Sequence, residues 1–70
     1  MERKPVSSST VASIGYDENT SILEVEFHNG RIYQYLSVPV EVFNGIMNAS
    51  SHGKYLNQNI KGKYRYQQIR

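Results

Sequence analysis

Two short apolar runs on either side of Asn29-Gly30 constrain the fold of this chain more than any other feature. The first run alternates apolar and acidic residues: Leu23, Glu24, Val25, Glu26 and Phe27. The second run extends from Ile32 to Val38. A period of two places successive side chains on opposite faces of an extended chain, and Asn-Gly favours a tight turn between strands. These residues therefore predict a β-hairpin.

The length of the hairpin loop decides which side chains share a face, because a shift of one residue moves every side chain to the other side. A two-residue Asn29-Gly30 loop pairs Val25 with Gln34, which places an amide among apolar residues. A three-residue loop with Gly30 in a left-handed bulge pairs Val25 with Tyr33 instead. We prefer the second register because it separates the side chains by polarity. It groups Leu23, Val25, Phe27, Tyr33 and Tyr35 on one face, and it leaves Glu24, Glu26 and Gln34 on the other, where we interpret the two carboxylates as solvated surface.

The remaining elements can be located by the same kind of pattern. Val11–Tyr16 predicts a short strand, and Val42, Phe43, Ile46 and Met47 recur at helical spacing within a helix from about Pro39 to Ala49. Ser50 or Ser51 can cap a second short helix whose inward stripe is Tyr55, Leu56 and Ile60, with Gly62 as a stop. Tyr64 to Ile69 alternates and can add a last strand or an extended edge.

These elements predict an α+β fold with a small antiparallel sheet of three or four strands and two short helices packed on one face. Residues 1–8 are polar and contain Pro5, so we expect a flexible N-terminal lead-in. The remaining residues, 9–70, form a single domain in this interpretation, because chains divide into separate cores only at several times a length of 70 residues.

The composition argues against several kinds of chemistry. The chain has no cysteine, and His28 and His52 are its only imidazoles, so we expect neither a disulfide nor a metal site and assign no cofactor. Ser50, Ser51 and His52 are adjacent but lack an orienting acid, and helix capping explains the serines better than nucleophilic catalysis. No stretch approaches about 20 apolar residues and no apolar signal segment follows the N-terminus, so we expect a cytoplasmic protein that does not bind a membrane. We expect no enzyme activity and identify no catalytic residue.

The charges are divided unevenly along the chain. Residues 1–50 carry three cations and six carboxylates, whereas residues 51–70 carry five cations and no carboxylate. Cations interleaved with aromatic residues suit RNA, because the cations hold phosphates while the rings stack on unpaired bases. The candidate RNA-binding residues are Lys54, Lys61, Lys63, Arg65 and Arg70 for phosphates and Tyr66 for stacking. The competing interpretation is a solvated basic surface, with Tyr55 and Tyr64 in the core.

Several motifs taken together resemble the KTSC domain family. They are a strand ending in Phe27, then Gly30, the triplet Tyr33-Gln34-Tyr35, the Val38-Pro39 step and the segment from Ala49 to Asn57 leading to Ile60-Lys61. The resemblance runs from about Val11 to Tyr66, so residues 9–70 would form one KTSC-like domain, although Leu56 stands where an aromatic residue is expected. The family is named for a short domain at the C-terminus of some lysyl-tRNA synthetases and includes free-standing bacterial proteins. Its function is unassigned, and RNA binding is suggested by the association with the synthetases.

These observations lead to two functional hypotheses. The first is a non-catalytic RNA-binding accessory module for tRNA or another structured RNA. The second is a protein-interaction or self-associating module, in which an exposed strand edge or the segment from Tyr64 to Ile69 pairs with a partner chain or a second copy.

Overall fold

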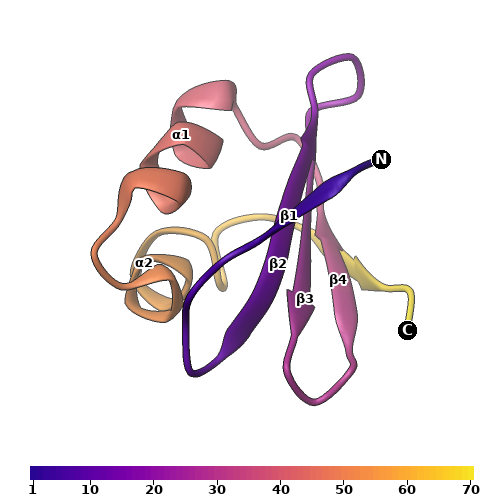
Figure 1. Ribbon diagram of the computed structural model, residues 1–70. Helices are drawn as coiled ribbons and strands as arrows, with labels where there is room; N and C mark the ends of the chain where they lie inside the picture. The colour runs from indigo at the N-terminus through magenta and orange to yellow at the C-terminus, as the bar shows by residue number, and fades with distance from the viewer.

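A computed structural model describes residues 1–70 and contains one antiparallel sheet of five strands in the order β1-β2-β3-β4-β5. The strands are β1 (Arg3–Pro5), β2 (Val11–Asp17), β3 (Ile22–Phe27), β4 (Ile32–Tyr35) and β5 (Tyr66–Gln68). The helices α1 (Val40–Asn48) and α2 (His52–Asn59) lie between β4 and β5 in the chain. Both helices lie on one side of the sheet (Figure 1). The predicted α+β class is confirmed, but the sheet has five strands, whereas we expected three or four.

The hairpin of β3 and β4 adopts the bulged register. Val25 lies opposite Tyr33 and Leu23 lies opposite Tyr35. The Phe27 amide donates to the Arg31 carbonyl at 2.9 Å, so the hairpin loop consists of the three residues 28–30. Gly30 has a φ of 90°, a conformation that residues with a Cβ rarely adopt. The preferred register is confirmed.

The strand β1 places Arg3–Pro5 in the sheet, where we expected a flexible lead-in over residues 1–8. Arg3 pairs with Gly15 and Pro5 with Ser13, so β1 is an edge strand of the sheet. Proline is tolerated there because an edge strand has one side without ladder hydrogen bonds. The sequence pattern did not indicate this strand because its three residues carry no apolar alternation, and pairing with β2 holds them in place.

The two helices cover the apolar face of the sheet. The α1 helix begins after Pro39, and the α2 helix is capped by Ser51, whose Oγ accepts a hydrogen bond from the Lys54 amide at 3.2 Å. Sheet and helices together bury a cluster of nine residues: Val11, Ile14, Leu23, Val25, Tyr35, Val38, Ile46, Leu56 and Ile60. Neither helix has the length and apolar character needed to cross a bilayer.

Candidate nucleic-acid interface

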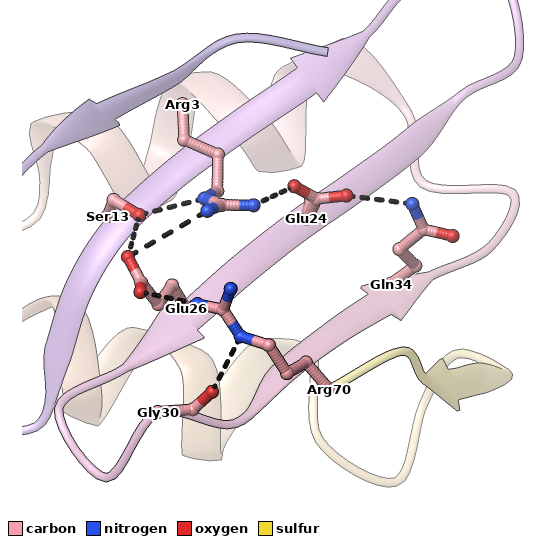
Figure 2. Close-up of polar contacts among 7 residues, drawn as sticks. All are labelled: Arg3, Ser13, Glu24, Glu26, Gly30, Gln34 and Arg70. Atoms are coloured by element: carbon pink, nitrogen blue, oxygen red, sulfur yellow. Dashed lines mark hydrogen bonds and ion pairs between the residues drawn. The ribbon is translucent and has the colours of Figure 1, made fainter.

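The helix-free face of the sheet carries a connected polar network. The Arg3 guanidinium forms an ion pair with Glu24 and donates to Ser13 Oγ at 3.0 Å, and Ser13 in turn donates to Glu26 at 2.8 Å. Figure 2 shows how the Arg3 side chain extends from β1 across β2 to reach the carboxylates of β3. The crossing is possible because Gly15, the partner of Arg3 in β2, has no side chain.

Further contacts extend this network to the last strand of the sheet. Gln34 donates to Glu24 at 2.8 Å, and Gln67 donates to Gln34 at the same distance. Arg70 forms an ion pair with Glu26 at 3.2 Å and donates to the Gly30 carbonyl at 3.3 Å. The polar side chains of this face therefore contact one another and join all five strands.

Glu24 is buried, which corrects its interpretation as solvated surface, and only 5% of its surface is exposed. Burial by itself raises the pKa of this carboxyl, but the hydrogen bonds from Gln34 and Arg3 and the positive charge of Arg3 outweigh it and hold the pKa below its ordinary value of 4.5. Glu24 therefore stays ionised and paired. A carboxylate already bound by two donors is suited to holding strands together and poorly suited to moving a proton.

On the other face of the sheet, aromatic rings follow the edge formed by β4 and β5. The Tyr33 ring packs edge to face with Phe27 at 5.4 Å between centroids and lies 5.2 Å from Tyr66. Tyr66 also lies 5.9 Å from Tyr35, which is buried in the core. We call Phe27, Tyr33 and Tyr66 the aromatic row. Its last member, Tyr66, is 59% exposed and presents aromatic surface to solvent.

A hollow of about 240 Å³ lies beside this aromatic row. Its lining residues are Thr10, Phe27, Asn29, Arg31, Tyr33 and Lys61. Arg31 and Lys61 are exposed, and neither takes part in any of the ion pairs, which involve Arg3, Arg70, Glu24 and Glu26 alone. The hollow thus combines aromatic rings with two cations whose charge is not neutralised by a neighbouring carboxylate.

Free carboxylates lie at the opposite end of the sheet. Asp17 is the last residue of β2 and Glu18 follows it in the turn that precedes β3, whereas Arg31 follows the turn at the other end of β3. Glu41 lies in the first turn of α1, and the start of that helix lines a hollow with Glu18. The six residues of β3 place these two ends roughly 20 Å apart. This separation leaves the basic end attractive to polyanions.

The structure brings some of the predicted RNA-binding residues to this end and separates others. Lys61 lines the hollow, Tyr66 belongs to the aromatic row, and the exposed Lys63 and Arg65 lie in the segment that joins them. Lys54 lies on α2 beside a different hollow, with Ser50, Ser51 and Tyr55 among its lining. Arg70 is on the helix-free face, where its guanidinium forms an ion pair with Glu26.

Arg31 is the residue of this surface that the division of charge along the sequence does not indicate. It belongs to the net acidic residues 1–50 and lies outside the basic residues 51–70. The hairpin register nevertheless indicates that Arg31 lies beside an aromatic residue, because it places Arg31 opposite Phe27 at the end of the hairpin.

Comparison with known proteins connects the chain to a family of small domains. The sequence model of the KTSC domain matches residues 7–64. An uncharacterized protein of Stutzerimonas stutzeri (strain A1501) is 44% identical over 70 residues, which cover 99% of both chains. A lysine–tRNA ligase of Nostoc punctiforme is 36% identical over 61 residues, and this match covers 87% of the present chain but 11% of the ligase.

A solved structure extends the similarity to the whole fold. The crystal structure of a KTSC domain protein from Yersinia pestis superposes with a TM-score of 0.93 at 43% sequence identity. The match covers 99% of this chain and 97% of the other.

Proposed function

The chain belongs to the KTSC domain family, and we propose that it is a non-catalytic RNA-binding module that acts on tRNA or another structured RNA. The observation that carries this proposal is the basic hollow beside the aromatic row, where Arg31 and Lys61 lie next to Phe27 and Tyr33 without carboxylate partners. Aromatic rings and free cations on one surface are the two components with which proteins bind single-stranded nucleic acid.

The comparisons support RNA as the polyanion. A lysine–tRNA ligase has tRNA in its name, and a region homologous to this chain makes up 11% of its length. The contacts of the polar side chains support a role without catalysis. Ser51 caps α2, His52 Nδ1 lies 2.7 Å from the Ile46 carbonyl, and Glu24 is held in an ion pair.

The salt dependence of RNA binding tests this proposal. If about three cations contact phosphates, the logarithm of the affinity for single-stranded RNA falls with the logarithm of salt concentration at a slope of roughly −2. Changing Lys61, Lys63 and Arg65 together to glutamine should flatten this slope. Tyr66→Ala should lower the affinity by about 1–3 kcal/mol at an unchanged slope, because stacking releases no counterions.

Fluorescence anisotropy across a salt series measures both effects, and circular dichroism verifies that each variant is folded. Lys4→Gln is the control, because Lys4 is exposed and lies on β1 at the opposite edge of the sheet. A wild-type protein that shows no measurable RNA binding at low salt would exclude RNA binding as its function.

The β5 edge favours a second candidate function, protein interaction by strand addition. All three residues of β5 are exposed, and β5 is the last strand of the sheet, so its outer backbone groups have no partner strand. The basic residues around this strand disfavour pairing with a second copy, since like charges would meet. Titration of a fluorescein-labelled extended acidic peptide tests this candidate, and binding that Tyr66→Pro abolishes would support it.

A further inference from the structure

We propose that the basic hollow is a subsite for one unpaired nucleotide, so that the module selects single-stranded or looped RNA over duplex RNA. The proposal rests on the RNA-binding function proposed above and specifies the kind of RNA. It follows from three properties of the hollow: its aromatic wall, its cations and its size.

The aromatic wall consists of Phe27 and Tyr33, both of which are only half buried. Their rings pack edge to face, with an angle of 69° between their planes, so the pair does not close into a parallel stack. A planar base can contact such a wall by stacking. Tyr66 continues the aromatic row beyond Tyr33 and provides a position for a neighbouring base.

The polar lining matches the other parts of a nucleotide. Arg31 and Lys61 supply positive charge for a phosphate. The Asn29 side-chain oxygen accepts a hydrogen bond from the Arg31 amide at 3.0 Å, which orients the Asn29 side chain and leaves its NH₂ group available to donate to a base edge. An acidic peptide could satisfy the two cations, but it would leave the aromatic wall and the Asn29 amide without matching groups.

The size of the hollow limits the ligand. Pockets for drug-sized ligands and cofactors have volumes of about 300–1,000 Å³, whereas this hollow holds about 240 Å³. It is therefore too small to enclose a whole nucleotide, but it can take the base of one nucleotide of a longer chain while the phosphate stays at its rim. The bases of an A-form duplex are stacked on one another and cannot present a free face to Phe27 or Tyr33, so only an unpaired base can occupy the hollow.

The test compares a fluorescein-labelled single-stranded RNA of ten nucleotides with the duplex that it forms with its complement. We expect the wild-type protein to bind the single strand at least tenfold more tightly than the duplex at the same salt concentration. Arg31→Gln should weaken single-strand binding and reduce its salt slope by about 0.7, the contribution of one phosphate contact. Phe27→Leu keeps an apolar side chain but removes the ring, and it should weaken single-strand binding about fivefold or more.

The Lys4→Gln variant is the charge-matched control for Arg31→Gln, and it should bind both RNAs like the wild type. Equal binding of single strand and duplex, or equal effects of Arg31→Gln and Lys4→Gln, would overturn the nucleotide subsite and leave RNA binding itself intact. Absence of binding to both RNAs and to tRNA would overturn both proposals. A poly-glutamate peptide that binds as tightly as the single strand, with the same loss in Phe27→Leu, would assign the hollow to an acidic protein segment and also overturn the subsite.

Discussion

Gly15 is the residue on which the attachment of β1 depends. A Cβ at this position would lie 2.7 Å from the Glu2 carbonyl oxygen and 3.0 Å from Arg3 Cγ, which is closer than a stable contact allows. The absence of a side chain therefore serves two purposes. It lets β1 approach β2, and it lets Arg3 reach Glu24.

We expect Gly15→Ala to destabilise the protein by about 1–3 kcal/mol, the usual cost of inserting a methyl group into a packed site. Urea unfolding measures this loss. Gly53→Ala is the control, because a Cβ there would meet only Thr10 at 3.6 Å and alanine favours the helix. Equal stability of the two variants would contradict the role of Gly15.

Tyr35 makes stability sensitive to alkali. Burial, with smaller effects from Tyr33 and Tyr66, raises the pKa of the Tyr35 hydroxyl from 10.0 to about 12. The unfolded chain releases this proton at a lower pH than the folded chain does. The stability associated with Tyr35 is thus fully present below about pH 10 and is lost as the pH rises toward 12.

Tyr35→Phe removes this titration, whereas the other tyrosines remain in both proteins. We therefore expect the free energy of unfolding to fall less between pH 9 and pH 11 in the variant than in the wild type, with urea unfolding as the measurement. Parallel pH profiles for the two proteins would show that Tyr35 ionises normally in the folded state.

At the scale of elements, the contact between the two helices depends on Gly45. A Cβ on Gly45 would lie 2.6 Å from Tyr55 Cζ and closer still to its hydroxyl oxygen. Gly45 lies within α1 and Tyr55 within α2, so the missing side chain of one helix accommodates the ring of the other. This contact explains why a glycine, which weakens an isolated helix by about 1 kcal/mol relative to alanine, is found within α1.

Helix propensity and tertiary packing predict opposite effects of Gly45→Ala on the stability of the protein. In the wild-type background we expect a loss of about 1–3 kcal/mol, because the new methyl group displaces the Tyr55 ring. In a Tyr55→Ala background the same change should stabilise the protein by up to about 1 kcal/mol, because only helix propensity then acts. Chemical denaturation of the four proteins in this cycle measures the reversal, and a gain in both backgrounds would contradict the contact.

At the scale of the whole molecule, the helix-free face ties the first strand to the last through one buried carboxylate. The lowered pKa of Glu24 means that the unfolded chain takes up a proton at a higher pH than the folded chain does. The stability from this group is present above the ordinary value of 4.5 and is lost as the pH falls below it.

Glu24→Gln should therefore make the fold less sensitive to acid, although it weakens the pairing with Arg3 at neutral pH. We expect the slope of unfolding free energy against pH below 4.5 to decrease in this variant, by at most about 1.4 kcal/mol per pH unit. Glu18→Gln is the control, since Glu18 is an exposed carboxylate without an ion pair. Identical acid profiles for wild type and Glu24→Gln would contradict the prediction.

Local patterns in the sequence predicted the features that depend on neighbouring residues. Alternation located β3, the Asn29-Gly30 turn and side-chain polarity selected the bulged register, and Ser51 was one of two proposed caps of α2. Each of these signals reflects a local backbone preference, because turn geometry, strand period and helix capping act within a few residues of the chain. The motifs that resemble the KTSC family could likewise be recognised in the sequence because each consists of residues close together in the chain.

Contacts between residues far apart in the chain follow from tertiary packing and could not be predicted from local patterns. It added β1 to the sheet, buried Glu24 beneath Arg3 and placed Arg31 beside Lys61. Arg3 and Glu24 are 21 positions apart, so no local pattern links them. Such contacts depend on how the sheet and helices close around a shared core. Gly15 and Gly45 illustrate this dependence. Each lacks a side chain, but this matters only because the packing brings β1 against Gly15 and the Tyr55 ring of α2 against Gly45.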